Sequence, residues 1–313
     1  MVDSIPEKLD ELELDESLGR GVTCTVRLAV ARCNSKQRFA AKIVEKASIV
    51  GQAQLTRLFR EKELLGTLSH PSIVTFYATF QDETHLYFLL ELLRGGELLW
   101  HMRRAPHQRV AEESTRSCIA ALLLPLQYMH EQGVLYRDLK PTNIMFTETG
   151  RLKLVDFGHA KRVEAGERSI SVCGTPHYHA PETVCGDGHG FPAQLWALGV
   201  LLAELTLGEA PFWERPGRPP LKVQILEHKP QLEAMPVEMR ALAGALLEPS
   251  AEARERLFPA GYADVMVHQW LALLDWDAIK DGRCVPAFDF AAHAAHCVPE
   301  DHGNVPADLF ADF

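Results

Sequence analysis

The sequence has no surplus of positive charge. Its 313 residues include 32 Lys and Arg against 42 Asp and Glu, which gives a formal net charge of −10. Surfaces that bind nucleic acids or anionic membranes are rich in basic residues. The composition therefore argues against both partners, and a basic peptide is a better electrostatic match.

A secretory signal and a membrane span are also missing. The acidic segment Met1–Glu7 lacks a basic stretch followed by an apolar one, and Val2 stands where myristoylation requires glycine. The longest apolar runs, residues 119–126 and 195–203, fall short of the roughly 20 residues that a spanning helix needs. We expect a soluble protein of the cytoplasm or nucleus.

Cysteine and histidine patterns typical of metal sites are lacking. The seven cysteines are scattered, and none of the fourteen histidines has zinc-protease spacing with a neighbouring Glu. Cysteines that are odd in number and show no spacing pattern indicate reduced thiols, as in a cytosolic protein. The remaining composition, 47% hydrophobic and 24% charged without internal repeats, is typical of globular domains.

Hydrophobic periodicity divides the chain into a strand-rich first part and a helix-rich remainder. A helix over residues 52–68 is the exception in the first part. Strands are predicted at 26–31, 38–44, 73–80 and 85–90, with a turn at 34–36, and helices at 98–104, 112–130, 193–205, 222–228, 236–247 and 262–268. No period is evident over 277–313. The order predicts an α+β protein with a small five-stranded lobe, a large mostly helical lobe and a tail.

The most informative stretch is Tyr136-Arg137-Asp138-Leu139-Lys140-Pro141-Thr142-Asn143, followed by Asp156-Phe157-Gly158. Phosphoryl transfer needs a residue that orients the attacking hydroxyl, a cation for the moving phosphate and oxygen ligands for magnesium. A carboxylate, a lysine, an amide and a second carboxylate at these spacings meet those needs. Other elements of the same pattern flank them: the glycine loop Leu18–Val26, Lys42, Glu61 and Ala180-Pro181-Glu182.

In this order the motifs resemble those of the eukaryotic protein kinases. Residues 155–163 and 172–176, and His268-Gln269-Trp270-Leu271, narrow the resemblance to the AGC group, nearest the cyclic-AMP- and cyclic-GMP-dependent kinases. The resemblance implies a bilobal protein kinase fold. Its expected parts are an N-terminal segment 1–13, a kinase domain 14–276 and an AGC-type tail 277–313. Within the domain, the small lobe ends near residue 91, the hinge spans 91–97 and the large lobe 98–276.

The same resemblance implies the catalytic roles. Asp138 would orient the substrate hydroxyl and accept its proton, and Lys140 would balance charge on the γ-phosphate. Asn143 and Asp156 would hold Mg²⁺.

ATP binding is implied as well. Lys42, paired with Glu61, would hold the phosphates, and the backbones of Glu91 and Leu93 would bond the adenine edge. The implied ATP-binding residues are Leu18, Gly19, Gly21, Val26, Ala40, Lys42, Glu61, Leu90, Glu91, Leu93, Glu97 and Met145.

The resemblance also implies a Ser/Thr substrate with upstream arginine, bound through Glu97, Glu204 and Thr175. Ser171 is the expected activating phosphosite, with Ser169 as its competitor. Arg137 and Lys161 would supply the pairing charges. A separate regulatory subunit or an activating kinase is expected, and the terminal Phe310-Ala311-Asp312-Phe313 is expected to dock on the small lobe.

Some residues depart from the family pattern. Cys24 replaces a glycine, Thr142 an acid, and Gln194 an Asp that accepts backbone N–H bonds. His177 and His179 replace a Glu and a Leu. The partner of Glu182 is either Arg254 or Arg256. These departures leave a catalytically weak or dead scaffold as the alternative, and a small-molecule kinase as a further one.

Overall fold

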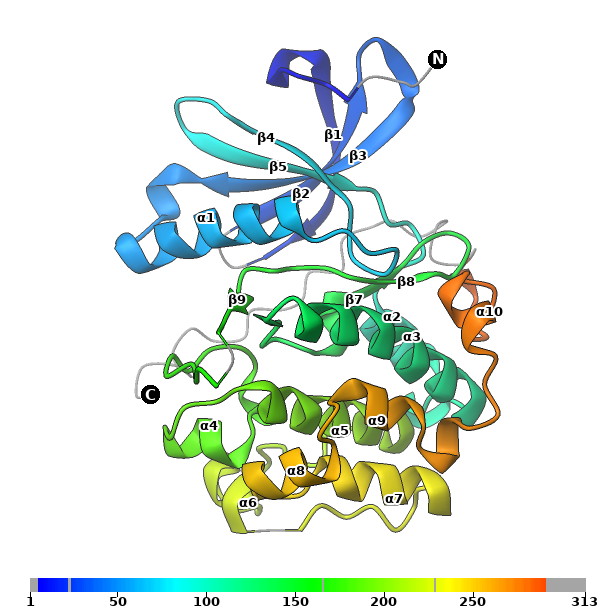
Figure 1. Ribbon diagram of the computed structural model, residues 1–313. Coiled ribbons are helices and arrows are strands. Elements are labelled where there is room, and N and C mark those ends of the chain that lie inside the picture. Colours follow the sequence, from blue (N-terminus) through cyan, green and yellow to red (C-terminus); the bar gives the residue numbers. More distant parts are fainter. Residues whose placement is uncertain (1–4, 22–23, 165, 228, 291–313) are drawn as a thin grey trace. The chain divides into compact units, whose positions relative to one another are not determined.

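The computed structural model describes residues 5–21, 24–164, 166–227 and 229–290, and these fall into two compact units (Figure 1). The first comprises residues 5–55 and Thr75–Leu92, and the second comprises Thr56–Val74 and residues 93–290. The chain passes from the first unit to the second at Leu92, inside the segment expected to be the hinge. Among the described residues, no helix is both long and apolar enough to cross a membrane.

The first unit is an antiparallel five-stranded sheet, as predicted. Its strands are β1 (Leu12–Arg20), β2 (Cys24–Ala31), β3 (Asn34–Glu45), β4 (Phe76–Gln81) and β5 (His85–Glu91), in the order β1-β2-β3-β5-β4. Two predicted boundaries were wrong. Asn34 already pairs with Ala31, so the turn is Arg32-Cys33. Strand β4 begins at Phe76 because Ile73 belongs to the second unit, where it forms a parallel bridge with Leu154.

The alternation of side chains along β3 separates a core face from a functional face. Phe39 and Ala41 point into a buried cluster completed by Leu12, Ala29, Ala31 and Leu89. Phe39 meets Tyr77 edge to face at 5.2 Å. The intervening residues, Ala40 and Lys42, therefore lie on the opposite face of the sheet.

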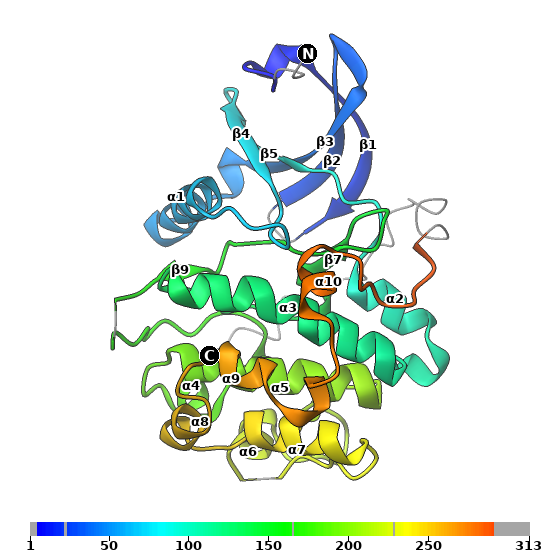
Figure 2. The ribbon, with the colours of Figure 1, turned by 45° about the vertical axis from the view of Figure 1, so that its right-hand side comes forward.

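The second unit is mainly helical. Its long helices are α3 (Glu112–Glu131) and α5 (Phe191–Leu207), which contact each other, and α7 (Val237–Leu246) packs against α5 (Figure 2). Helix α5 is buried on nearly all sides. The other helices are α1 (Gln52–Thr67, most of which belongs to this unit), α2 (Leu98–Arg104), α4 (Pro181–Cys185), α6 (Leu221–Glu227), α8 (Ala251–Leu257), α9 (Tyr262–Met266) and α10 (Trp276–Lys280).

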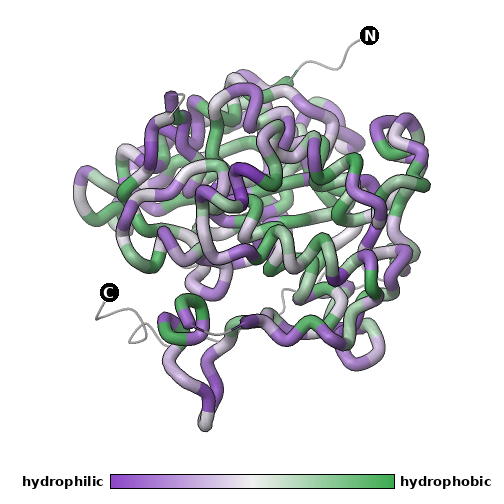
Figure 3. Tube along the Cα trace, turned by 60° about the horizontal axis from the view of Figure 1, so that its bottom comes forward, coloured by the Kyte–Doolittle hydropathy of each residue, from purple (hydrophilic) through white to green (hydrophobic). Residues whose placement is uncertain are grey.

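Two small β-ladders complete this unit. Strand β6 (Val134–Leu135) pairs with β9 (Lys161–Arg162), and β7 (Ile144–Phe146) pairs with β8 (Leu152–Leu154). The stretch Tyr136–Asn143 connects β6 to β7, and the Asp156 motif follows β8. Hydrophobic and hydrophilic residues alternate at short intervals along most of the trace (Figure 3).

The start of the expected tail is part of the second unit. Asp277 lies within α10, and the chain continues to Phe288, which stacks on the buried His101 ring of α2 at 4.6 Å. The N–H of Ala287 donates to Ser114 Oγ at 3.1 Å. Up to residue 290 the expected tail is therefore packed against the second unit, with aromatic contacts that the sequence did not predict. The terminal Phe310–Phe313 motif lies outside the described residues.

A buried ion pair ties α4 to α8. The guanidinium of Arg254, which is 0% exposed, donates to Glu182 Oε1 and also to the carbonyl of Pro192 at 3.0 Å. The structure thus selects Arg254 over Arg256 as the partner of Glu182.

We predict that Arg254→Met lowers the free energy of unfolding by about 3–5 kcal/mol, because it leaves a buried carboxylate without its counter-charge. The matched control Arg256→Met removes an exposed arginine and should change it by less than about 0.5 kcal/mol. Urea denaturation followed by circular dichroism measures both. Equal losses in the two variants would contradict the assignment.

Candidate active site

Asp138 is the central charged group of the second unit. Its side chain is buried, and Oδ2 lies 2.9 Å from Lys140 Nζ. Asn143 Nδ2 donates to the same oxygen at 2.9 Å, and Thr175 Oγ1 donates to Oδ1 at 2.8 Å. These partners, which come from two segments, hold the carboxylate in one orientation. It is suited to orienting a hydroxyl and accepting its proton.

Arg137, next to Asp138, has a left-handed backbone with φ 68°. Such a conformation costs a non-glycine residue of order 1–3 kcal/mol. Its Nε donates to the His159 carbonyl at 2.7 Å, which fixes the side chain. Gly174 approaches so closely that an added Cβ would lie 2.4 Å from the Arg137 carbonyl oxygen. The segment before Thr175 therefore requires glycine at this position.

Gln194 supports the catalytic loop from α5. Its Oε1 accepts the backbone N–H of Tyr136 at 2.6 Å, and the side chain is buried. This confirms that the amide oxygen can accept a bond where the family pattern has a carboxylate. Tyr136 in turn donates its hydroxyl to the Val155 carbonyl and meets Phe157 edge to face at 5.3 Å. The loop carrying Asp138 is thereby joined to the segment carrying Asp156.

Asp156 and Asn143 have the chemistry of magnesium ligands. Asp156 is exposed, and its Oδ1 accepts the Gly158 N–H at 3.2 Å. Asn143 uses Nδ2 to bond the Asp138 main chain and side chain, so that Oδ1 is the atom suited to a cation. Carboxylate and amide oxygens are the ligands that Mg²⁺ prefers. The residues fit the ion that the sequence predicts.

The surroundings of these groups are acidic. Glu61 of α1 is buried, and its Oε2 would lie 3.5 Å from a Cβ built on Gly158. Burial raises the pKa of Tyr136 well above its ordinary value, and the Asp156 and Asp138 carboxylates raise it further. Concentrated negative charge of this kind attracts a divalent cation.

Ser171 and Ser169 both contact Arg137. Its Nη1 donates to Ser169 Oγ and to Ser171 Oγ, each at 2.8 Å. Ser171 is exposed, whereas Ser169 is buried and exchanges two backbone hydrogen bonds with His189. Ser171 is therefore the more accessible of the two hydroxyls. Lys161, expected to join Arg137 there, instead contacts Glu167 Oε1 at 2.8 Å.

Sequence reasoning missed two further cations near this segment. Burial lowers the pKa of Arg137, and Arg60 and Arg57 of α1 lower it further by charge repulsion. Their spacing of three residues puts both on one face of α1, which was the available signal. An anion among these three guanidinium groups would relieve the repulsion.

Glu204, an expected arginine-binding acid, is nearly enclosed. It accepts a hydrogen bond from the Tyr178 hydroxyl, and burial raises its pKa. Glu97, the other acid, lies next to Met145 in a backbone bridge. Glu97 therefore lies beside β7, and Glu204 contacts Tyr178, three residues after Thr175.

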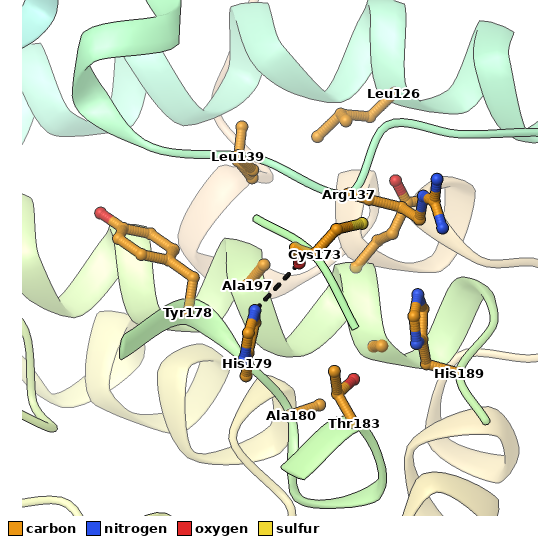
Figure 4. A pocket seen from close by; sticks show the side chains of 12 residues that line it. Leu126, Arg137, Leu139, Cys173, Tyr178, His179, Ala180, Thr183, His189 and Ala197 are labelled. Atoms are coloured by element: carbon orange, nitrogen blue, oxygen red, sulfur yellow. Dashed lines mark hydrogen bonds between the residues drawn. The ribbon is translucent and has the colours of Figure 1, made fainter. Parts of the chain in front are cut away.

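The two substituted histidines flank Tyr178. His179 Nε2 lies 2.9 Å from the Cys173 carbonyl, beside a cavity of about 40 Å³ that Arg137, Leu139 and Ala197 also line (Figure 4). The His177 ring packs on Trp213 at 4.3 Å, and burial lowers its pKa to about 4. His177 is therefore neutral at pH 7, where the family pattern has a negative charge.

The first unit gathers its expected ATP-binding residues through strand register. Val26 lies opposite Lys42, Ala40 lies opposite Leu90, and directly opposed residues share a face. Gly19 pairs with Val26 at the end of β1, near Leu18. Lys42 Nζ lies 5.9 Å from the centre of the Phe88 ring. One face of the sheet thus carries apolar side chains around a lysine.

The glycine loop closes tightly at Cys24. The Gly21 N–H donates to the Cys24 carbonyl at 2.8 Å, and a Cβ on Gly21 would lie 3.1 Å from Cys24 Sγ. Gly21 and Cys24 are therefore in close contact where the loop meets β2.

The chain after Glu91 and Leu93 runs along β7 in the second unit. Gly95 donates its N–H to the Phe146 carbonyl at 2.8 Å, and a Cβ on Gly95 would lie 2.2 Å from the Thr147 carbonyl oxygen. Only glycine permits this approach. It sets Glu97 beside Met145.

Comparison with known proteins gives the family directly. The family model described as the protein kinase domain matches residues 12–271. The chain is 33% identical to a cAMP-dependent protein kinase catalytic subunit of Dictyostelium discoideum, over 88% of the chain and 42% of that protein. It is 33% identical to a cAMP-dependent protein kinase catalytic subunit-like protein of Caenorhabditis elegans, over 89% of the chain and 69% of the relative.

A third relative is the cGMP-dependent protein kinase egl-4 of Caenorhabditis elegans, 33% identical over 91% of the chain and 37% of that protein. The chain thus spans about half the length or less of two of these relatives, and about two thirds of the third. The matched region contains the Asp138, Asp156 and Glu182 motifs described above. The chain belongs to the protein kinase domain family, within its AGC group.

Proposed function

We propose that this chain is a serine/threonine protein kinase that transfers the γ-phosphoryl group of Mg-ATP to basic peptides. The observation that carries the proposal is the buried Asp138 carboxylate, held by Lys140, Asn143 and Thr175. A dead scaffold would have no need of this arrangement. The proposed kinase domain spans residues 14–276, with the tail beyond it.

Each residue of the site has a role in the proposed transfer. Asp138 orients the substrate hydroxyl and takes up its proton, and Lys140, 2.9 Å away, faces the developing charge on the phosphoryl group. Lys42 holds the nontransferred phosphates, and Glu61 is its proposed partner. Asn143 and Asp156 hold magnesium, which neutralises phosphate charge when bound.

The proposed substrate is a Ser- or Thr-containing peptide with arginine upstream. The chain's net charge of −10 favours a basic partner. Glu97 is the main proposed acid, because Glu204 already accepts the Tyr178 hydroxyl and Thr142 supplies no carboxylate. Ser171 is the proposed activating phosphosite. The proposed partners are an activating kinase or a separate regulatory subunit.

We also propose a cytoplasmic or nuclear location. The cysteines that the structure describes, Cys24, Cys33, Cys118, Cys173, Cys185 and Cys284, are all free thiols. Free thiols fit a reducing compartment.

Replacing the proposed base tests the activity itself. Asp138→Asn should lower kcat by at least about 100-fold, because the amide cannot accept the proton. The control Asp187→Asn changes an exposed aspartate of the same unit and should be fully active. Transfer of radioactive phosphate from Mg-ATP to an arginine-rich peptide measures both. Near-normal turnover by Asp138→Asn would refute the role.

Two arginine positions in the substrate should contribute unequally to kcat/KM. Replacing arginine three residues before the phosphosite should lower kcat/KM by about tenfold. Replacing arginine two residues before it should lower kcat/KM by about threefold or less. The reason is that a charged hydrogen-bonded pair contributes roughly 1.5–3 kcal/mol, and only where both partners are present. Glu97→Gln should abolish the difference, whereas Glu148→Gln, at an exposed acid, should keep it. Equal losses for both peptides in the unmodified chain would contradict the proposal.

Gln194 should matter for the geometry of the catalytic loop. Gln194→Leu leaves the buried Tyr136 N–H without an acceptor, which costs about 1–3 kcal/mol of stability and should lower kcat. Gln194→Asp restores an acceptor and should recover kcat. Thermal unfolding and steady-state kinetics on the same preparations separate the two effects. A fully active Gln194→Leu variant would show that the bond is dispensable.

A further inference from the structure

A cavity of about 380 Å³ lies in the second unit, between α3 and the loop that follows α1. The loop contributes His70, α3 contributes Leu124 and Tyr128, α9 contributes Met266, and α10 contributes Lys280. Helices α9 and α10 both contact α3 (Figure 2). Binding sites for small molecules have volumes of about 300–1,000 Å³. The cavity is therefore large enough for a small organic molecule, and it shares no residue with the candidate active site.

One wall of the cavity is aromatic. The His70 ring stacks on the Tyr128 ring, with 5.3 Å between their centres and 27° between their planes. The Tyr128 hydroxyl accepts the Ser69 N–H at 3.0 Å, which fixes this pair. Leu124 and Met266 add apolar surface, and a methionine thioether packs favourably against aromatic rings. These walls favour a flat aromatic guest.

The His70 ring offers a hydrogen-bond donor in a region of positive charge. Its Nδ1 accepts the Ser72 N–H at 3.0 Å. Burial and then the positive charges of Arg151 and Lys153 lower the pKa of His70 to about 4. The ring is therefore neutral at pH 7, and its proton is on Nε2. An anion would be attracted both by this N–H and by the two cations.

Lys280 adds an ammonium group to the cavity. Its ion pair with Asp277 is 3.7 Å long and exposed on both sides. Such pairs are weak, so the ammonium is available to another anion. Arg151 donates a hydrogen bond to the Lys280 carbonyl, and its charge also acts on His70. Lys280 and His70 therefore both lie near the same cation.

The lining also contains an acid, Glu131. Its Oε1 accepts a hydrogen bond from Gln127 Nε2 at 2.8 Å, one turn earlier on α3. Because this bond engages the carboxylate, Glu131 opposes an anionic guest less than a free carboxylate would.

We propose that this cavity binds a small aromatic carboxylate. Its ring would lie against the His70–Tyr128 pair, and its carboxylate would accept hydrogen bonds from His70 Nε2 and Lys280 Nζ. The inference goes beyond the proposed function and does not rest on it, because it concerns binding without a chemical step.

The loop that lines the cavity also connects α1 to β8. Leu154 donates its N–H to the Ser72 carbonyl at 2.8 Å, and Val74 donates its N–H to the Leu154 carbonyl at 2.9 Å. Leu154 ends β8, two residues before Asp156. A bound carboxylate would therefore stabilise the loop between the helix that carries Glu61 and the strand that precedes Asp156.

The test titrates the full chain with 1-naphthoate in a calorimeter at neutral pH. We expect saturable binding with a Kd of about 1 mM or lower, given the size of the molecule. Neutral 1-naphthamide, which has nearly the same shape, should bind at least about fivefold more weakly, because it lacks the charge. Inorganic phosphate, which has no ring, should not compete. Absence of saturable naphthoate binding, equal affinity for the amide, or displacement by phosphate would each overturn the proposal.

Matched variants and hydrogen exchange locate the site. Lys280→Gln should raise the Kd for naphthoate about fivefold, and so should His70→Phe, which keeps a stacking ring but removes the donor. Lys222→Gln, at another exposed lysine, should leave the Kd unchanged. Circular dichroism checks that each variant is folded, and Lys280→Gln tests the site without altering the packed wall. Naphthoate should slow amide exchange in residues 69–74. An unchanged Kd in Lys280→Gln, or slower exchange only outside this loop and α3, would place the carboxylate elsewhere and refute the inference.

Discussion

The fixed orientation of the Asp138 carboxylate is the interaction on which the rest of the site depends. A buried negative charge is costly unless it is paired and hydrogen-bonded. Lys140 supplies the opposite charge, and Asn143 and Thr175 supply hydrogen bonds. Because Thr175 belongs to a segment distant in sequence, the same bonds that stabilise the carboxylate also hold the proposed substrate-receiving segment beside it.

This arrangement links Ser171 to Asp138 through Arg137. Arg137 contacts Ser171 through its side chain, and its strained backbone leads directly into Asp138. A phosphate on Ser171 would strengthen the hold on the Arg137 side chain and so reinforce a conformation that costs free energy. Arg57 and Arg60 would extend the effect to α1, the helix that carries Glu61. The fold thus offers a short physical route from the proposed phosphosite, Ser171, to the site residues of the second unit.

The sequence predicted the elements whose hydrophobic pattern or motif spacing can be read along one continuous segment. Strands β2 to β5 and helices such as α2 and α3 were found within a few residues of their bounds, whereas no bounds were predicted for β1. The Asp138 and Asp156 motifs were located by their residue spacing. Helices α4, α8 and α10 were missed because they are short and have few large apolar residues, whereas the equally short α2 contains Leu98, Leu99, Trp100 and Met102. Pairs formed by packing, such as Arg254 with Glu182 and Lys161 with Glu167, have no signature in the sequence. The sequence left the first pair open and did not predict the second.

Three of the departures from the family pattern, at Gln194, Thr142 and His177, share a physical direction, since each replaces an acid by a neutral group. At Gln194 the neutral amide still accepts the Tyr136 N–H, although such a bond is weaker than one to a carboxylate. The replacement also removes a negative charge from a region that already contains Asp138, Asp156 and Glu61. It therefore lowers the electrostatic repulsion among the acidic groups there. At Thr142 and His177 the change falls on the proposed substrate surface, where Glu204 is also occupied by Tyr178. The proposed recognition of an upstream arginine then depends chiefly on Glu97, whereas the Asp138 carboxylate is bonded by Lys140, Asn143 and Thr175.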